Sequence, residues 1–428
     1  MKYLILLILS VCLSGLCLAQ DKATIKRGIA LKVITDREDA IYAVGEKVTF
    51  KISASDEAGP ISGQAVQVVL STDGYKPQVP QTLELKEGTA EVNGRLDLPG
   101  FLSVKVTVKN AIALAAAAVD PLKIMPSQSV PDDFDEFWDA QRKSLAAIPA
   151  KVAMNPIPSP LTEVQAFDVT VDCLGAPVSG YFGKPVGAQP KSLPAILFVH
   201  GAGVNSSNLG SLNWCKQAGG MLAMDINAHG LPNGKPKEFY SDLANGELKD
   251  YRVRGRQSRD EIYFRGMFLR LIRAIDFLTS QPEWDGKRLI VYGSSQGGFQ
   301  ALAAAGLDSR VTFICAGVPA GCDHTGSQAG RISGWPKIVA TDSAGQPDPQ
   351  SLQASRYFDA VNFARRAKCV GAALTVGFID TTCPPTSVYA AYNALNMTKS
   401  IHNDPLSGHT STPAASKFMQ AAALEHLK

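Results

Sequence analysis

The sequence lacks the short patterns that commonly bind a metal ion. It contains no Cys-x-x-Cys pair and no His-Glu-x-x-His motif, and none of its six histidines lies close enough to another in the chain to suggest a pair of ligands. We therefore expect no metal site and no bound cofactor.

Clustered positive charge is absent as well. The 428 residues include 42 Lys and Arg against 39 Asp and Glu, and no basic cluster is interleaved with aromatic residues. A nucleic-acid-binding surface would need such a cluster, so nucleic acid is not expected as a partner. The hydrophobic content of 45% indicates globular packing, and the length indicates two domains rather than one.

The apolar run at the N-terminus is too short to cross a membrane. Residues 4–13 are apolar, Lys2 precedes them, and residues 17–19 (Cys-Leu-Ala) lead to Gln20. Because a spanning helix needs about 20 apolar residues, this pattern indicates a secretory signal at 1–19 that is cleaved. We expect export to the periplasm or the extracellular space, without a stable membrane span. An uncleaved anchor is the alternative.

Two of the eight cysteines lie in the expected signal. Export would permit disulfides between the others, but their spacing alone does not pair them. The six that remain are Cys173, Cys215, Cys315, Cys322, Cys369 and Cys383.

Residues 20–125 are predicted to form a small antiparallel β-sandwich of the immunoglobulin-like type. Short β-rich runs alternate with turn residues, and apolar and polar residues alternate within 48–52 and 104–108. The run 111–119 is apolar throughout, and we expect it to form a further buried strand.

Such a sandwich could bind carbohydrate, but it has few aromatic residues for an exposed sugar-binding platform. Tyr75 and Phe101 are the candidates. The favoured interpretation is therefore a spacer or packing domain.

The C-terminal part, 126–428, is predicted to be an α/β-hydrolase domain. A proline-punctuated linker at 121–131 leads to a helix that opens at Asp132 and Asp133. From residue 195 onward, continuous apolar strands alternate with helices, which indicates a parallel sheet covered on both faces. The apolar stripe of the first helix is Phe134, Phe137, Trp138, Gln141 and Leu145. The expected strands of the sheet are 195–199, 221–225, 289–292, 311–318 and 372–379, and the clearest helix is 265–280.

A candidate nucleophile lies in residues 293–298, Gly-Ser-Ser-Gln-Gly-Gly, between the strand 289–292 and the helix-forming run 299–305. In a G-x-S-x-G turn the serine lies on a strained bend, and the glycines on either side allow strand and helix to approach closely. This pattern predicts Ser295 as a nucleophile for acyl transfer and the Gln296 N–H as an oxyanion donor. A glycine-rich turn with an incidental serine is the alternative.

In an α/β-hydrolase the acid and the histidine follow the nucleophile in the chain. Asp380 ends the apolar run 373–379 and begins a loop, where such sheets place functional groups. An aspartate of a turn or helix cap is the alternative. Among the downstream histidines, His409 lies in a late loop before an expected C-terminal helix and is preferred over His402. His426 is expected to be exposed in the C-terminal tail.

The expected mechanism follows from these three residues. His409 takes the proton of Ser295, and Asp380 holds the other nitrogen of the imidazole ring. A second oxyanion donor should be a backbone N–H of the loop 200–203, in which His200 is expected to be structural because it precedes the nucleophile.

Several segments together resemble the acetyl xylan esterase and cephalosporin-C deacetylase family, carbohydrate esterase family seven. The resemblance covers roughly 300 residues and leaves out the N-terminal sandwich. The segments are 131–138 (PDDFDEFW), 200–201 (HG), 263–266 (YFRG), 293–298 (GSSQGG), 380–385 (DTTCPP), 389–393 (YAAYN) and His409.

This resemblance implies a metal-independent serine esterase that removes acetyl groups from short xylo-oligosaccharides and other small acetylated alcohols. It implies Ser295, Asp380 and His409 as the catalytic triad. The backbone N–H groups of Gln296 and Ala202 are implied as the oxyanion donors.

The sequence departs from the family pattern in three places. The tyrosine that follows His-Gly in the family is Ala202 here, which should open the acyl side of the pocket. The glutamate that follows the catalytic histidine is Thr410. The Arg-Gly-Gln motif is altered to 254–257 (RGRQ). The resemblance implies a homo-oligomer, but this altered motif and the added sandwich argue against an unchanged hexameric ring.

The sequence therefore predicts an exported serine carboxylesterase that acts on acetylated hemicellulose sugars. A peptidase of the prolyl-oligopeptidase type is an alternative, since it shares the fold and the order of the triad. A non-catalytic glycan-binding protein on the same fold is the other.

Overall fold

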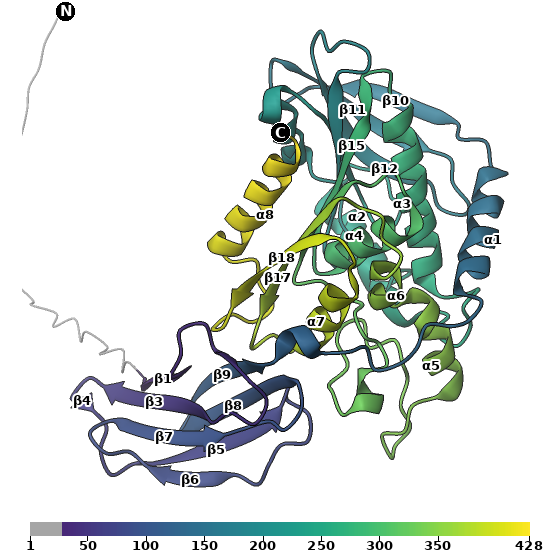
Figure 1. Cartoon of the computed structure of the whole chain (residues 1–428). Coiled ribbons are helices and arrows are strands. Elements are labelled where there is room, and N and C mark those ends of the chain that lie inside the picture. The colour runs from purple at the N-terminus through teal and green to yellow at the C-terminus, as the bar shows by residue number, and fades with distance from the viewer. Residues whose placement is uncertain (1–27) are drawn as a thin grey trace, which may run out of the picture.

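The computed structural model describes residues 28–428. The segment predicted to be a secretory signal, 1–19, lies outside the described residues. Two units are visible, a β-sandwich built by the N-terminal part and a larger α/β unit built by the rest (Figure 1). Within 28–428, no helix combines the length and the apolar character needed to cross a membrane.

The sandwich consists of two sheets whose alternating apolar side chains share one core, as the sequence pattern predicts. All paired strands are antiparallel except β2 and β9, which run parallel. The first sheet contains β1 (Ala30–Thr35), β3 (Val48–Asp56), β4 (Gly59–Pro60) and β7 (Thr89–Gly94). The second has the order β2 (Ile41–Tyr42), β9 (Ala111–Val119), β8 (Gly100–Val108), β5 (Ala65–Thr72) and β6 (Gln81–Glu84).

The second sheet is buried on both faces where β8 and β9 pair. Ala115, Ala117 and Val119 belong to the core of the sandwich. The intervening residues Ala116 and Ala118 belong to the core of the α/β unit. A strand that is covered on both faces needs no polar face, which explains the apolar residues 115–119 of β9. The prediction of a buried strand at 111–119 is confirmed for the second half, 115–119, whereas Ile112 and Leu114 in the first half are exposed.

Phe101 of β8 extends from the sandwich into the α/β unit. Its ring centroid lies 5.0 Å from that of Phe378 and 5.8 Å from that of Tyr389, and its side chain is fully buried. The prediction that Phe101 is an exposed aromatic is therefore wrong, because the α/β unit covers this face of the sheet. The other candidate, Tyr75, is partly exposed.

Helix α1 (Phe134–Ala146) follows the linker and packs on the α/β unit. The Trp138 indole N–H donates a hydrogen bond of 2.9 Å to the carbonyl oxygen of Tyr357. The predicted stripe is confirmed, since the buried residues of α1 are Phe134, Phe137, Trp138, Gln141 and Leu145.

A nine-stranded sheet forms the centre of the α/β unit, with the order β10-β11-β12-β14-β13-β15-β16-β17-β18. Strands β10 to β12 pair antiparallel, β12 pairs antiparallel with β14, and the remaining pairs are parallel. The predicted parallel sheet is thus confirmed, with an antiparallel extension at one edge. The strands are β10 (Val152–Ile157), β11 (Val164–Val171), β12 (Val178–Pro185), β13 (Leu193–Val199), β14 (Leu222–Ile226), β15 (Trp284–Ser294), β16 (Phe313–Gly317), β17 (Gly371–Gly377) and β18 (Thr398–Asp404).

Alternate residues of the central strands contribute to two cores on opposite faces of the sheet. Leu197 and Val291 belong to the large core, to which α1, α3, α4, α6 and α7 also contribute. Ile196 and Ile290 belong to a smaller core beneath α8. The helices that follow α1 are α2 (Lys237–Asn245), α3 (Tyr263–Ser280), α4 (Gln296–Leu307), α5 (Pro349–Ser355), α6 (Ala360–Ala364), α7 (Pro385–Ala394) and α8 (Pro413–His426).

The six cysteines of the described chain are all buried and free. All of them lie in the α/β unit. Within 28–428, packing rather than disulfide cross-links therefore stabilises the fold.

Candidate active site

Ser295 occupies a tight turn between β15 and α4. Its backbone has φ 58° and ψ −120°, a conformation that non-glycine residues rarely adopt. Glycine is required on both sides: a Cβ on Gly293 would lie 2.5 Å from the carbonyl oxygen of Val199, and one on Gly297 would lie 2.2 Å from it. The turn is held by a 2.8 Å hydrogen bond from the Ser295 N–H to the carbonyl oxygen of Gly317. This geometry is that of a nucleophile elbow.

The structure brings Ser295, His409 and Asp380 together in one hydrogen-bonded row, which we call the Ser-His-Asp chain. His409 Nε2 lies 2.9 Å from Ser295 Oγ, and His409 Nδ1 lies 2.8 Å from Asp380 Oδ2. The other carboxylate oxygen, Asp380 Oδ1, accepts the N–H groups of Thr382 and Cys383, each at 2.8 Å. The carboxylate is fully buried, whereas the His409 side chain is 26% exposed. Water and substrate can therefore reach the imidazole, while the two backbone N–H groups hold the buried carboxylate in place.

The hydrogen-bond partners fix the proton positions in the Ser-His-Asp chain. A carboxylate only accepts, so His409 Nδ1 carries the proton and donates it to Asp380. His409 Nε2 is then the acceptor for the Ser295 hydroxyl. This is the tautomer that a general base for Ser295 requires.

The other two downstream histidines lie outside this row. His402 is in β18, its Nε2 is 3.6 Å from Asp404 Oδ2, and its ring lies beside Phe418. His426 Nε2 is 2.9 Å from Thr312 Oγ1. The prediction that His426 is exposed is wrong, because the last turn of α8 packs on the sheet and leaves the His426 side chain half-buried. This burial lowers the pKa of His426.

The two predicted oxyanion donors come from two separate segments near Ser295. Gln296 is the first residue of α4, and Ala202 lies in the loop after β13. Neither backbone N–H donates to a protein acceptor in the described part of the chain. The loop passes close to the nucleophile, since a Cβ on Gly201 would lie 3.8 Å from Ser295 Cβ. Both donors are thus free, and their role as an oxyanion hole stays a prediction.

His200 has the structural role that the sequence predicts. Its Nε2 accepts the N–H of Ala228 at 2.9 Å, so its Nδ1 carries the proton and donates to the carbonyl oxygen of Gly201 at 2.6 Å. Burial lowers the pKa of His200, which keeps the ring neutral. The side chain therefore ties the loop after β13 to the end of β14.

A buried cluster of rings supports the same loop. His229 Nε2 donates to the carbonyl oxygen of Gly203 at 3.0 Å, and its Nδ1 accepts the hydroxyl of Tyr263 at 2.7 Å. Burial lowers the pKa of His229 to about 4, so the ring is neutral at pH 7. Tyr251 packs edge-on against His229 and donates its hydroxyl to Gln296 Oε1 at 2.5 Å. The cluster thus links the loop to the elbow.

The sequence patterns assign no role to the residues of this ring cluster. One signal exists for His229, because the segment 227–230 follows β14 at the carboxyl edge of the sheet, where the elbow also lies. Tyr251 and Tyr263 follow a long connection without regular periodicity. Their position beside the elbow depends on how this connection folds.

Three potential metal-ligand atoms lie within 4.8 Å of one another, on Asp380, Cys383 and His409. They suit a metal poorly, because both carboxylate oxygens already accept hydrogen bonds and both imidazole nitrogens are engaged. Burial also raises the pKa of the Cys383 thiol well above its usual value, so the thiolate that binds metals is disfavoured. The donor set fits the Ser-His-Asp chain better than a metal centre.

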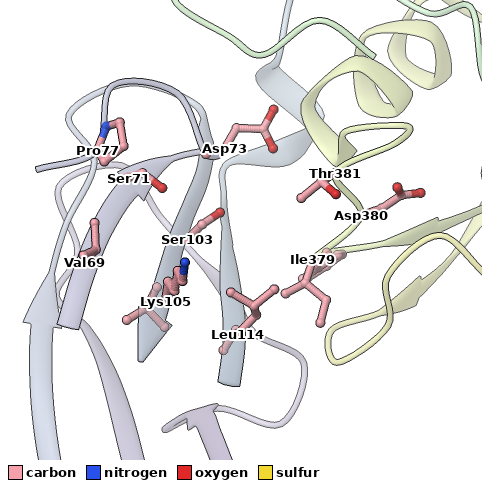
Figure 2. A pocket seen from close by; sticks show the side chains of 14 residues that line it. Val69, Ser71, Asp73, Pro77, Ser103, Lys105, Leu114, Ile379, Asp380 and Thr381 are labelled. Atoms are coloured by element: carbon pink, nitrogen blue, oxygen red, sulfur yellow. The ribbon is translucent and has the colours of Figure 1, made fainter. Parts of the chain in front are cut away.

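The sandwich also borders the Ser-His-Asp chain. A cavity of about 200 Å³ lies between the units; Figure 2 shows Ser71, Asp73 and Ser103 on its sandwich side and Ile379, Thr381 and Asp380 opposite. Asp73 is buried, and its Oδ2 has no hydrogen-bond partner among the described residues. Burial raises the pKa of Asp73 to about 7. A second carboxyl group, from the sandwich, thus lies close to Asp380.

Several known proteins are similar to this chain. The acetyl esterase Axe7A of Xylanibacter ruminicola is 30% identical over 396 residues, which cover 89% of this chain and 86% of that protein. An acetyl xylan esterase structure from Paenibacillus sp. R4 aligns with a TM-score of 0.60 and 29% identity, over 71% of this chain and 97% of its own. Acetyl xylan esterase 1 from Thermoanaerobacterium sp. JW/SL YS485 shares the fold, with a TM-score of 0.58, 22% identity, and coverage of 72% and 98%.

The family comparison matches the α/β unit and the end of the sandwich. The model of the acetyl xylan esterase family (AXE1) matches residues 112–427. The Axe7A match covers more of this chain than that model spans, so it extends into the sandwich. Because the family model matches well over half of the sequence, the chain belongs to the acetyl xylan esterase family and is a carboxylic-ester hydrolase of the deacetylating type.

Proposed function

We propose that this protein is a serine carboxylesterase that removes acetyl groups from acetylated xylan or xylo-oligosaccharides and from other small acetate esters through an acyl-enzyme. The observation that carries the proposal is the Ser-His-Asp chain on its strained elbow, with an exposed imidazole and a buried carboxylate. The xylan substrate is suggested by the names of the family and of its relatives.

In the first half of the reaction, Ser295 Oγ attacks the acetyl carbonyl carbon while His409 Nε2 takes the hydroxyl proton. Asp380 stabilises the imidazolium through the Nδ1–H bond and keeps the ring in place. The negative charge that develops on the carbonyl oxygen is stabilised by the N–H groups of Gln296 and Ala202. His409 then gives the proton to the departing sugar hydroxyl, which leaves an acetyl group on Ser295.

In the second half, water replaces the sugar. His409 Nε2 takes a proton from the water molecule, whose oxygen attacks the acetyl carbon, and then returns a proton to Ser295 Oγ as acetate leaves. Ala202 carries only a methyl group beside the site, and its side chain is exposed. Esters with an acyl chain longer than acetate should therefore also be accepted.

The substitution with the largest expected effect is Ser295→Ala. It removes the nucleophile, so kcat for release of a chromogenic acetate ester should fall by about 10⁴-fold or more. Ser411→Ala is the matched control, because the Ser411 hydroxyl donates to Ser294 and not to the Ser-His-Asp chain. Its activity should stay near that of the wild type. Retained esterase activity in Ser295→Ala would refute the proposal.

The same assays separate the alternative functions. A prolyl-oligopeptidase-type peptidase would cleave proline-containing peptides and leave acetyl esters intact. A non-catalytic glycan-binding protein would bind xylan without releasing acetate. We expect acetate release from acetylated xylo-oligosaccharides and no peptide cleavage.

We also propose export, with cleavage after Ala19. Support comes from the sequence pattern of 1–19. The mass and N-terminal sequence of the protein recovered outside the cytoplasm should correspond to a chain that begins at Gln20. An intact N-terminus on an exported, membrane-bound protein would instead support the anchor.

A further inference from the structure

A second and larger cleft lies where the sandwich meets the α/β unit. Its volume is about 1050 Å³, which is at the upper end of the ~300–1,000 Å³ typical of ligand sites. Residues of both units line it. Those that carry the inference are Tyr75 from the sandwich and Arg252, Arg256, Arg331, Lys337 and Thr381 from the α/β unit.

The lining is rich in positive charge. It contains four cations and a single carboxylate, that of Asp250. A cleft lined by one sign of charge concentrates the field and attracts ligands of the opposite sign. The overall composition does not reveal this feature, because acidic and basic residues are nearly balanced over the whole chain.

Two of the four cations are already engaged by the protein. Arg331 forms an ion pair of 2.8 Å with the buried Asp323. Arg256 faces Asp348, whose pKa it helps to lower, although the two form no hydrogen bond. The ion pair holds the Arg331 guanidinium group against Asp323.

The other two cations have no carboxylate partner within the described chain. Arg252 donates one N–H to the carbonyl oxygen of Pro336 at 2.7 Å, which leaves its remaining donors available. The exposed Lys337 ammonium has neither an ion pair nor a hydrogen bond within 28–428. The cleft thus presents uncompensated positive charge to a ligand.

The wall of the cleft is fixed to the loop that carries Asp380. Thr381, the next residue, lines the cleft. The Trp335 N–H donates to the carbonyl oxygen of Thr382 at 2.7 Å, and Gly334 packs so closely that a Cβ there would lie 2.8 Å from Pro384 Cδ. The cleft therefore borders the loop that begins at Asp380, although Ser295 and His409 themselves do not line it.

Tyr75 adds an aromatic surface from the sandwich. Its ring is partly exposed, and a Cβ on Gly330 would lie 3.7 Å from it. The Lys76 ammonium lies over one face of the ring, 5.3 Å from its centroid. A flat aromatic face beside donor groups is a combination that binds a sugar ring with polar substituents.

We propose that this cleft binds an acetylated oligosaccharide that carries a carboxylate, such as a uronic acid side group, and so favours acidic over neutral substrates. Lys337 and Arg252 bind the carboxylate, and Tyr75 packs on a sugar ring. A carboxylate suits the planar guanidinium fork, which can donate two parallel hydrogen bonds to it. This inference rests on the proposed function, because it names the substrate class of the same site.

The test compares acetate release from two xylo-oligosaccharides of equal length and acetylation, one neutral and one bearing a single glucuronic acid group. Wild-type kcat/KM should be about fivefold to tenfold higher for the acidic substrate at low ionic strength. Added salt should reduce the difference. A chromogenic acetate ester, which is too small to reach the cleft, should be cleaved equally by the wild type and by every variant of a cleft residue, and so reports correct folding.

Substitutions should then remove the preference selectively. The double variant Arg252→Gln with Lys337→Gln should cleave the acidic and neutral substrates at the same rate. Tyr75→Ala should raise KM for both oligosaccharides and leave the chromogenic ester unaffected. Lys143→Gln is the matched control, because Lys143 is exposed on α1 and does not line the cleft.

The outcomes separate this inference from the proposed function. Equal wild-type kcat/KM for acidic and neutral substrates would overturn the inference and leave the esterase proposal intact. If neither oligosaccharide releases acetate, the proposed substrate class fails. In that case, calorimetry with the Ser295→Ala variant tests whether the cleft binds the acidic oligosaccharide. Absence of binding would overturn the inference.

Discussion

The two sheets of the sandwich differ in what covers them. The first sheet has one face on the sandwich core and the other exposed, so buried and exposed residues alternate along β3 from Phe50 to Ala54. The second sheet has the sandwich core on one face and the α/β unit on the other, through Phe101, Ala116 and Ala118. The first sheet completes the sandwich, whereas the second also completes the core of the catalytic unit.

This difference bears on how the sandwich should be regarded. The family model begins at residue 112 and so includes most of β9 but not β8. Yet Phe101 of β8 contacts Phe378, two residues before Asp380, and Tyr389 in the helix after it. A spacer domain would not be expected to pack against both ends of the segment that carries the acid. The second sheet is better described as part of the support of Asp380.

The sharpest test of this comparison is a pair of phenylalanine truncations. Phe101→Ala and Phe50→Ala each remove a fully buried ring, one from the interface and one from the sandwich core. Each should lower the free energy of unfolding by about 3–5 kcal/mol. Only Phe101→Ala should also lower kcat, by about tenfold, because it removes the packing behind Phe378 and lets Asp380 shift. Denaturant unfolding and esterase kinetics measure the two effects.

Phe101→Leu provides a check on the interpretation. It keeps most of the apolar volume, so kcat should recover most of the way to the wild-type value. The comparison between the sheets would fail if Phe50→Ala and Phe101→Ala reduced kcat equally, since the effect would then reflect general loss of stability.

Phe101 is predicted to be exposed but is buried, and the reason shows a limit of what the sequence pattern can predict. The apolar and polar alternation over 104–108 identifies a strand with one face inside the sandwich. It does not say whether the opposite face meets water or another domain, because Phe is compatible with both. In the second half of β9 the sequence does indicate burial of both faces, because 115–119 are all small apolar residues, and these five residues are buried.

The Ser-His-Asp chain, by contrast, could be located from local patterns. The glycines around Ser295 are required by backbone contacts with Val199, and Asp380 and His409 occur in the order that the fold demands. Edge strands gave weaker signals: β10 is mostly exposed and has no continuous apolar run. The cationic cleft was not predictable, because its cations come from segments far apart in the chain.

A second test uses the buried carboxyl group of the second sheet. Burial raises the pKa of Asp73 to about 7; the nearby Asp380 and Asp323 raise it as well, while Thr386 and Arg331 lower it. Between pH ~4 and 7 the unfolded chain has lost this proton and the folded chain retains it. Stability contributed by Asp73 is therefore present below pH ~4 and is lost as the pH rises to 7.

Asp73→Asn removes this titration. The stability of the wild type relative to the variant should fall with rising pH by at most about 1.4 kcal/mol per pH unit, and only below pH 7. Urea midpoints measured from pH 4 to pH 8 give the difference. The pKa of Asp359 is also raised to about 7. Because Asp359 is present in both the wild type and the variant, its contribution cancels in the difference between their stabilities. If the stabilities of the wild type and the variant changed in parallel with pH, Asp73 would not be buried from water by the α/β unit.

The smallest expected effect concerns the connection between the two units. Asn393 of α7 donates two hydrogen bonds of 2.9 Å, to the carbonyl oxygens of Pro121 and Ile124. Asn393→Ala should lower the free energy of unfolding by about 1–2 kcal/mol and increase proteolytic cleavage of the linker, because the Ile124 carbonyl loses the Asn393 amide and the Pro121 carbonyl keeps only the Ile124 N–H. Asn93→Ala, which breaks a bond to Thr49 within the first sheet, is the control. It should destabilise to a similar degree without exposing the linker, because its hydrogen bond lies within the first sheet and does not involve the linker. Equal linker cleavage in both variants would contradict the distinction between the sheets.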